Sequence, residues 1–283
     1  MEGTPAKGKD WSNLSTRLGS ALVIAAVTLV CLYIGGWVWT AFLILGGGRA
    51  AYEFGRMSHR GDDDASTQTW VLVFATVAAV IAWAVFPNDM RVSFLVVLLG
   101  SLAISFLWEA ISRTSSRIWL AVGFLYVFLP LIAAIWLRGF AVGFDADGFQ
   151  RILFVILTVV AADAGAYFAG KTIGGPKLAP KISPNKTWAG FLGGLALGGV
   201  AGSTYAILSG ASLAQALPIA LLVVVASVAG DFLESAFKRK FGVKDSGSIF
   251  PGHGGVLDRI DSHMAALTLY ALLALAAPQI LPL

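Results

Sequence analysis

Long runs of apolar residues constrain this chain more than any other feature of its sequence. The hydrocarbon core of a bilayer is about 30 Å thick, and an α-helix needs about 20 consecutive apolar residues to cross it. Backbone N–H and C=O groups must pair within such a segment, so a long apolar run indicates a spanning helix. Nine runs fit, at residues 18–34, 37–54, 70–86, 92–108, 118–137, 152–170, 188–208, 217–237 and 264–281.

The chain is therefore expected to be an all-α, polytopic membrane protein with about nine transmembrane helices. Its composition agrees, because 57% of the 283 residues are apolar and only 13% are charged, whereas about a quarter are charged in an ordinary soluble domain. The run at 37–54 is the least regular. Gly46, Gly47 and Gly48 interrupt it, so this helix is expected to be broken or tilted.

Lysine and arginine are distributed unevenly between the two sides of the predicted bundle. Short loops that are translocated across the membrane avoid these residues, which therefore mark the cytoplasmic side. With the N-terminus in the cytoplasm, all 20 lysines and arginines fall on the inner side except Arg91, Arg138 and Arg151. The sorting predicts a cytoplasmic N-terminus and, in a bacterium, residence in the inner membrane.

Clustered polar groups are confined to the second half of the chain. Residues 1–150 consist of apolar runs joined by short loops, and we expect them to serve as a scaffold. Residues 151–283 carry three polar clusters, all at predicted cytoplasmic ends of spans or in the loops that join them. The functional site is therefore expected within residues 151–283, on the cytoplasmic side.

The first cluster, at residues 163–190, combines an acid inside a span with a basic loop. Asp163 lies within the sixth run, where an ionisable side chain marks either a function or a hydrogen-bonded packing role; both stay open. The loop after it has four lysines and no acid, which suits anionic headgroups or phosphates but also fits ordinary positive-inside charge. The segment "SPNKTW" predicts a rigid turn that presents Ser183, Lys186 and Thr187 together.

The second cluster, at residues 230–240, follows one face of the helix that ends the eighth run. Glu234, Ser235 and Lys238 lie three, four and seven positions after Asp231, which places the four side chains on one helical face. Such a face needs water, an ion or a ligand. The simpler alternative is a helix that emerges into the cytoplasm with solvated charges.

The third cluster, at residues 244–262, reads "KDSGSIFPGHGGVLDRIDS". If the last helix begins near Val256, Asp258 and Asp261 lie one turn apart and their carboxylates face one way. Together with Asp231 they make an all-oxygen set suited to Mg²⁺. Basic side chains surround this set, and a metal with basic side chains is the equipment of phosphoryl or nucleotidyl transfer.

Glycine flanks His253 in the segment "PGHGG". Glycine lets the backbone approach a phosphate closely, although any tight turn also uses it. His253 could act as a metal ligand, a base or a hydrogen-bond donor, and the oxygen-rich surroundings favour a donor.

The residues of these clusters, as they are spaced here, resemble the signature of the phosphatidate cytidylyltransferases, also called CDP-diacylglycerol synthases. The segment "AYFAGKTIGGPKLAPKISPNKTWAG" is similar to a second well-marked segment of that family, whereas the first half of the chain matches only as a string of spans. The signature residues are Ser235, Lys238, Arg239, Lys244, Asp245, Pro251, His253, Gly254, Gly255, Asp258, Arg259 and Asp261.

The resemblance implies a nucleotidyltransferase of phospholipid biosynthesis that converts CTP and phosphatidate to CDP-diacylglycerol and pyrophosphate. It also implies a homodimer within membrane lipid, without a nucleic-acid partner, and Mg²⁺ on Asp231, Asp258 and Asp261 with a monovalent cation such as K⁺ beside it. The implied catalytic residues are Asp231, Asp258, Asp261, Lys238 and Arg239. The implied substrate-binding residues are Ser183, Lys186, Thr187, Ser235, Lys244, Asp245, His253, Gly254, Gly255 and Arg259.

Two other classes of protein fit parts of the pattern. In a cation-coupled transporter, Asp163 and Asp231 would line an ion path and the basic loops would only fix the topology. Another membrane enzyme of lipid phosphates, such as a lipid-alcohol phosphotransferase or a polyprenol kinase, would use similar groups. Apart from the resemblance, the residues do not decide among these, because they do not show which base the nucleotide carries.

A stripe of glycines marks the seventh run. Gly190, Gly194, Gly198 and Gly202 recur every four residues, so one face of that helix allows another helix to approach closely. The stripe is expected to pack either within the bundle or between two subunits.

Overall fold

The computed structural model describes residues 11–58, 65–85, 99, 118–249 and 254–283. This part of the chain is almost entirely helical, as the sequence predicts. The helices are α1 (Trp11–Ile34), α2 (Gly36–Ser58), α3 (Ala65–Val85), α5 (Trp119–Arg138), α6 (Asp147–Thr172), α7 (Trp188–Leu208), α8 (Leu213–Lys240) and α9 (Leu257–Ala276). Apart from position 99, the predicted run at 92–108 lies outside the described residues.

A small hairpin and a short turn complete the described part. Strands β1 (Lys177–Ala179) and β2 (Ser183–Thr187) pair antiparallel between α6 and α7. The 3-10 turn η2 (Pro278–Ile280) follows α9, so the last helix ends several residues before the predicted run does. Proline at position 278 accounts for this, since it lacks the N–H that a continuing helix requires.

Four of the described helices, α5 to α8, are long and apolar enough to cross a membrane. Their outer faces expose large apolar side chains, among them Val160 on α6, Leu192 on α7 and Leu222 on α8. Exposed apolar faces of this extent are unfavourable in water and suit a hydrocarbon environment. The chain is a membrane protein.

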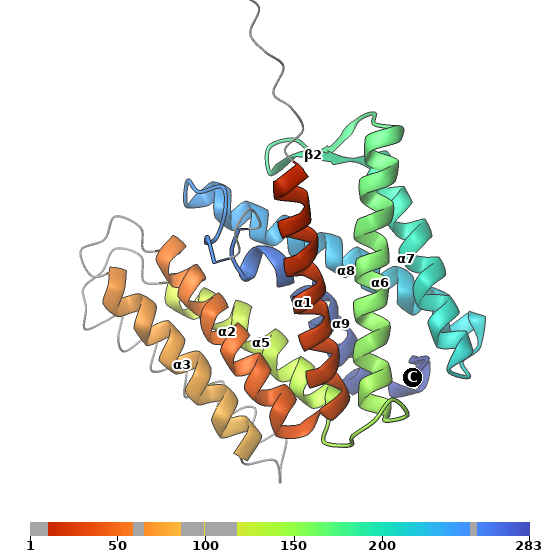
Figure 1. The fold of residues 1–283 in the computed structure, drawn as a ribbon, viewed down its shortest axis with the longest axis horizontal. Helices are drawn as coiled ribbons and strands as arrows, with labels where there is room; N and C mark the ends of the chain where they lie inside the picture. The colour runs from red at the N-terminus through yellow and green to blue at the C-terminus, as the bar shows by residue number, and fades with distance from the viewer. Residues whose placement is uncertain (1–10, 59–64, 86–98, 100–117, 250–253) are drawn as a thin grey trace, which may run out of the picture.

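The helices form two groups that share α9 (Figure 1). Helices α2, α3 and α5 pack together, whereas α6 and α7 run side by side and contact α8. The start of α1, the end of α6, the hairpin and the end of α8 lie at one end of the molecule, at the top of Figure 1. The loop between α5 and α6 and the C-terminus lie at the other end.

Aromatic side chains join the first group of helices to the end of α8. Phe54 on α2 lies edge-on to Phe237 on α8, with ring centroids 5.4 Å apart. Trp119 at the start of α5 contacts Phe241 just beyond α8 in the same way, at 4.8 Å. The end of α8 is therefore held by helices from the first half of the chain.

Helix α2 is continuous from Gly36 to Ser58, so of the two alternatives, a broken or a tilted helix, the break at its three glycines is wrong. A Cβ atom at Gly47 would collide with the side chain of Leu131 on α5. Gly47 therefore permits α2 and α5 to pack closely, and it does not interrupt α2.

The glycine stripe of α7 packs inside the chain. A Cβ at Gly194 would lie 3.0 Å from the carbonyl oxygen of Ala162 on α6. A Cβ at Gly198 would press on the backbone of Thr158 and the side chain of Val224, which belong to α6 and α8. Of the two positions that the sequence allowed, the stripe takes the one within the bundle.

Candidate active site

The hairpin between α6 and α7 folds onto the end of α8. Lys186 on β2 forms an ion pair with Asp231, and its ammonium lies 4.7 Å from the ring centre of Phe232. The Nε of Arg239 donates a hydrogen bond to the carbonyl oxygen of Ile182 at 3.4 Å. The turn predicted from "SPNKTW" is thus an ordered hairpin that brings Lys186 to Asp231.

The side chain of Thr187 is turned away from this contact. It is buried, and its hydroxyl accepts a hydrogen bond from the N–H of Gly190 at 3.1 Å, which caps the start of α7. Ser183 pairs with Ala179 in the hairpin and is half-buried. Of the three residues expected to be presented together, Lys186 alone reaches the acidic centre on α8.

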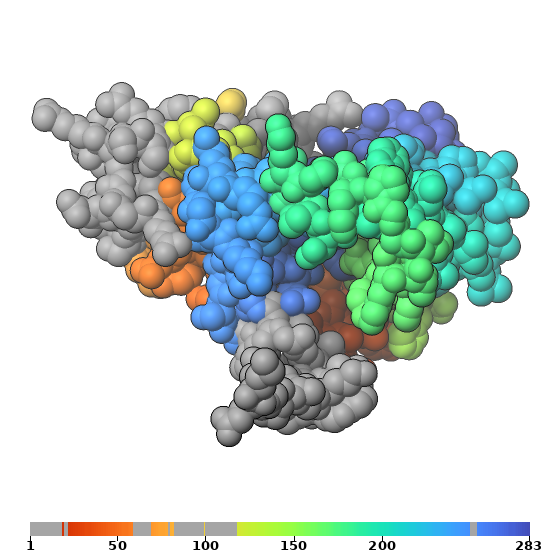
Figure 2. All heavy atoms as spheres, turned by 90° about the horizontal axis from the view of Figure 1, so that it is seen from above, coloured from red at the N-terminus to blue at the C-terminus, as the bar shows by residue number. Residues whose placement is uncertain are grey.

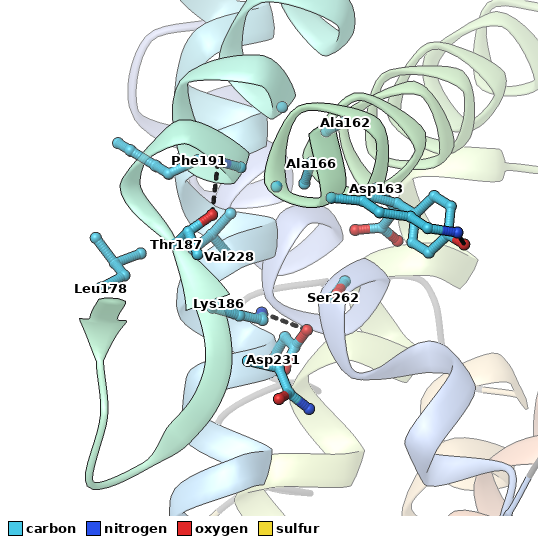
Figure 3. A pocket seen from close by; sticks show the side chains of 16 residues that line it. Ala162, Asp163, Ala166, Leu178, Lys186, Thr187, Phe191, Val228, Asp231 and Ser262 are labelled. Carbon is cyan, nitrogen blue, oxygen red and sulfur yellow. Dashed lines mark hydrogen bonds and ion pairs between the residues drawn. The ribbon is translucent and has the colours of Figure 1, made fainter. Parts of the chain in front are cut away.

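A pocket of about 490 Å³ lies between α6, α7, α8 and the hairpin (Figure 3). Asp163, Lys186, Asp231 and Ser262 are among its polar lining residues, while Ala166 and others provide an apolar wall. Asp163 on α6 therefore faces the same pocket as Asp231. This favours a functional role over the packing role that the sequence had left equally open.

Lys238 connects α8 to the start of α9. Its ammonium lies 2.6 Å from Oε2 of Glu234 and 2.7 Å from Oδ1 of Asp258. One turn earlier, the hydroxyl of Ser235 donates to Asp231 at 3.3 Å. These contacts between residues four positions apart confirm that the polar residues of α8 share one face.

Asp258 is held by several donors at the start of α9. Its Oδ2 accepts hydrogen bonds from the N–H and the hydroxyl of Ser246, both at 2.9 Å, and from the N–H of Gly255 at 2.8 Å. Burial alone would raise the pKa of Asp258, but the bonds from Lys238, Gly255 and Ser246 outweigh it and hold the pKa below its ordinary value.

Asp261 lies one turn further along α9 in a different environment. The helix begins at Leu257, close to the expected start at Val256, so the spacing of the two aspartates is as expected. Asp261 is 8% exposed, and its Oδ1 accepts from the N–H of Ser262 at 2.7 Å. Burial, and next the negative charge of Asp231, raise the pKa of Asp261 to about 6.

The glycines before α9 lie against carboxylates. Gly254 has a φ of +78°, which favours glycine, and a Cβ there would meet Oδ2 of Asp258. The N–H of Gly255 is used by the same carboxylate. The expected phosphate cradle is thus engaged with Asp258, and the expected site residue His253 lies outside the described residues.

The other expected site residues lie at the surface of the same end. Lys244, Asp245 and Arg259 are exposed. In Figure 2 the end of α8 and the segment that follows it (blue) lie between the α2–α3 region (orange) and the hairpin with α6 and α7 (green). The segments that carry these exposed residues thus follow α8 or begin α9, next to Lys238 and Asp258 in the chain.

Glu53 on α2, within residues 1–150 that were expected to be scaffold, contacts the loop before α9 and the start of that helix. It is 1% exposed, and its Oε2 accepts from the N–H of Leu257 at 2.9 Å and from the hydroxyl of Ser246 at 3.3 Å. The Nε of Arg49 donates to its Oε1 at 3.0 Å. An acid within a predicted apolar run was the available signal, the same one that singled out Asp163.

The expected metal site on Asp231, Asp258 and Asp261 stays a prediction. Within the part that the structure describes, no three His, Cys, Asp or Glu side chains converge closely enough to hold a metal. The reason is that Asp258 bonds Lys238 and the loop before α9, whereas Asp231 bonds Lys186.

The chemistry of the donors nevertheless fits a divalent cation. Oε1 of Glu234 is buried without a hydrogen-bond partner among the described residues. Oxygen ligands of this kind are those that Mg²⁺ prefers. Four carboxylates, those of Asp231, Glu234, Asp258 and Asp261, lie close to one another around Lys186 and Lys238.

Comparison with known proteins identifies relatives along almost the whole chain. Residues 15–276 match the profile of the Cytidylyltransferase family. A phosphatidate cytidylyltransferase of Brucella suis biovar 1 (strain 1330) is 37% identical over 268 residues, which cover 91% of this chain and 92% of the relative. Shorter matches include proteins of the same name from Pseudomonas aeruginosa, 48% identical over 44% of this chain and 48% of the relative, and Bacillus subtilis, 43% identical over 46% and 50%.

Proposed function

The chain belongs to the cytidylyltransferase family, and we infer from this membership that its reaction takes place at the centre between α8, α9 and the hairpin. It is a phosphatidate cytidylyltransferase, which converts CTP and phosphatidate to CDP-diacylglycerol and pyrophosphate. The observation that carries this assignment is the match to relatives of that name over 91% of the chain. It decides against the transporter, the phosphotransferase and the polyprenol kinase.

Charge neutralisation is the main task that this reaction sets. Phosphatidate is largely a dianion near neutral pH, since the second pKa of a phosphomonoester is about 6, and it can attack the α-phosphorus of CTP without a general base. Two polyanions must then be brought together and aligned. We assign this task to Lys186, Lys238 and Arg239, supported by the exposed cations Lys244 and Arg259.

The carboxylates of the centre would hold Mg²⁺. Asp231, Asp258 and Asp261 are the proposed ligands, supported by their position with Glu234 where the last turns of α8 meet the start of α9. When bound, Mg²⁺ would polarise phosphoryl oxygens and offset charge that develops on them. A monovalent cation such as K⁺ beside it belongs to the same proposal.

The pocket beside Asp231 suits the substrates' different solubilities. It lies beside the hairpin residue Lys186, and part of its wall is formed by Ala166 of α6 and Phe191 of α7 (Figure 3). A lipid headgroup could enter with its chains still in the bilayer, while CTP arrives from the water. Further proposed substrate contacts are Ser183, Thr187, Ser235, Asp245, His253, Gly254 and Gly255. Thr187 would contact substrate from the start of α7, and Gly254 and Gly255 from the loop before α9.

The arrangement of the chain in the membrane is proposed from its apolar runs and from its distribution of lysine and arginine. We propose nine spans, a cytoplasmic N-terminus and a cytoplasmic site, in the inner membrane of a bacterium. The position of the start of α1 at the same end as the hairpin supports this sidedness. A homodimer is also proposed. Its contact would lie away from the glycine stripe, because α6 and α8 already cover Gly198.

One incubation tests the function directly. Protein purified in detergent is mixed with phosphatidate, Mg²⁺ and each nucleoside triphosphate in turn. The lipid products are then separated and identified by mass spectrometry. CTP should yield CDP-diacylglycerol together with one equivalent of pyrophosphate. Absence of that product, or equal use of ATP, would contradict the assignment.

A further inference from the structure

We propose that Glu53 is a positioning residue for this reaction, which orients Asp258 through Ser246 and through the first residue of α9. The inference rests on the proposed role of Asp258 in the site. It makes α2, in the first half of the chain, part of the active centre.

The burial of Glu53 is energetically costly and must be offset by specific contacts. A carboxylate that is 1% exposed carries a large desolvation penalty unless it is paired and hydrogen-bonded. Arg49, one turn earlier on α2, donates to the Oε1 side. The Oε2 side is directed to Ser246 and Leu257, which lie on the loop before α9 and at the start of that helix.

The bond to Leu257 caps α9 from another helix. Leu257 is the first residue of α9, where a backbone N–H has no partner within the helix. The residue before it, Val256, provides no side-chain cap. A carboxylate is also favoured there by the helix dipole. Glu53 therefore fixes the backbone of Leu257, the residue directly before Asp258.

Ser246 forms the second connection. Its hydroxyl lies 2.9 Å from Oδ2 of Asp258 and 3.3 Å from Oε2 of Glu53, and its N–H also donates to Asp258. Because a hydroxyl has a single proton, the shorter bond to Asp258 is favoured when both carboxylates are ionised. The hydroxyl of Ser246 thus lies between the two acids and donates to one of them at a time, while its N–H stays on Asp258.

The shape of the loop supports this role. A Cβ at Gly255 would collide with Oε2 of Glu53 and with the hydroxyl of Ser246, and a Cβ at Gly247 would collide with Oε1 of Glu53. Two glycines of the loop therefore lie directly against this one carboxylate. Loss of Glu53 would free the loop and the start of α9 together, and Asp258 would move with them.

The test replaces Glu53 by glutamine in the full-length protein. An amide has one acceptor oxygen, so Glu53→Gln turns N–H donors toward either Arg49 or Leu257, which are donors themselves. We expect kcat to fall by about 10- to 100-fold, as for other residues that orient a ligand or reacting group. The KM values for CTP and phosphatidate should change by less than about threefold, because the lost alignment matters mainly in the transition state.

Arg56→Gln is the matched control. Arg56 is an exposed cation three positions after Glu53 on the same helix, so the change there leaves the contacts of Glu53 intact. Its kcat should remain within about twofold of the wild type. If Glu53→Gln retains the wild-type kcat, or if both variants lose kcat equally, Glu53 serves only the stability of α2 and the proposal is wrong.

A double-variant cycle tests the route through Ser246. Ser246→Ala should lower kcat by itself, and adding it to Glu53→Gln should cause little further loss, because both remove one connection. If the loss of kcat in the double variant equals the product of the two single losses, the route through Ser246 is wrong. If Glu53→Gln does not purify as a folded protein, Glu53→Asp takes its place under the same criteria. A wild type that forms no CDP-diacylglycerol from CTP would instead overturn the function itself.

Discussion

Lys238 on α8 and Asp258 at the start of α9 form an ion pair of 2.7 Å that joins the last two helices at the active centre. The same ammonium lies 2.6 Å from Glu234, which is 1% exposed. One lysine therefore compensates two acids that come from different helices. Its loss would leave both acids without their cation in a poorly hydrated place.

We expect Lys238→Met to abolish turnover and to destabilise the protein by about 3–5 kcal/mol, the usual effect of removing one partner of a buried pair. Thermal unfolding in detergent and the CTP-dependent assay measure the two effects. Lys240→Met is the control, since Lys240 is exposed and contacts the ring of Trp119 at 5.2 Å. A folded Lys238→Met of wild-type stability would show that the pair contributes nothing.

The proposed metal ligands lead to a second prediction. Asp231→Asn, Asp258→Asn and Asp261→Asn keep the size of each side chain but remove the charge that would bind Mg²⁺, so each should abolish turnover while the protein still purifies folded. Asp147→Asn, the same change at the exposed start of α6, should leave activity at the wild-type level. Normal turnover in Asp258→Asn at ordinary Mg²⁺ would remove Asp258 from the metal site.

Local patterns made α8 predictable, and its contacts follow from helix spacing alone. Asp231 and Ser235, like Glu234 and Lys238, are four positions apart and touch in the structure. Lys186 was assigned to the site and does reach Asp231. These residues were found because the geometry of one helix, or a short loop beside it, places them.

Glu53 could not be found in this way. It lies 193 positions from Ser246 and 204 from Leu257, so its contacts depend on how α2 packs against α9. Likewise, Gly255 was expected to face phosphate, whereas its N–H serves Asp258. A hydrophobic pattern shows that a helix is buried against others, but it does not show which helix is its neighbour or which acid a loop encloses.

The raised pKa of Asp261 predicts how stability depends on pH. Its pKa is about 6 in the folded protein, above its ordinary value of 3.8, so the folded state binds the proton more tightly than the unfolded state. Stability in EDTA should therefore rise as the pH falls from above 6 toward 4, and the ionised group should cost stability at pH 8.

Asp261→Asn should flatten this dependence and raise the melting temperature at pH 8, although the variant is inactive. Melting curves of both proteins between pH 5 and 8 provide the measurement. Ser262, whose N–H bonds Asp261 through the backbone, offers a control: Ser262→Ala should leave the slope unchanged. A wild-type melting temperature that does not vary over this range would contradict the assignment of a raised pKa.

Close packing along the glycine stripe of α7 is the last prediction. At Gly198 a side chain would press on Thr158 and Ala162 of α6 and on Val224 of α8. We expect Gly198→Leu to push these helices apart and to destabilise the protein by at least about 1–3 kcal/mol, the usual cost of overpacking. Gly46→Leu is the control, because Gly46 also lies within a helix, but among the described residues no atom beyond its own stretch of helix lies within 4 Å of the position of a Cβ. Its melting temperature in detergent should stay close to the wild type, whereas that of Gly198→Leu should fall. Equal melting temperatures for the two variants would mean that the glycines of α7 are not required for helix packing.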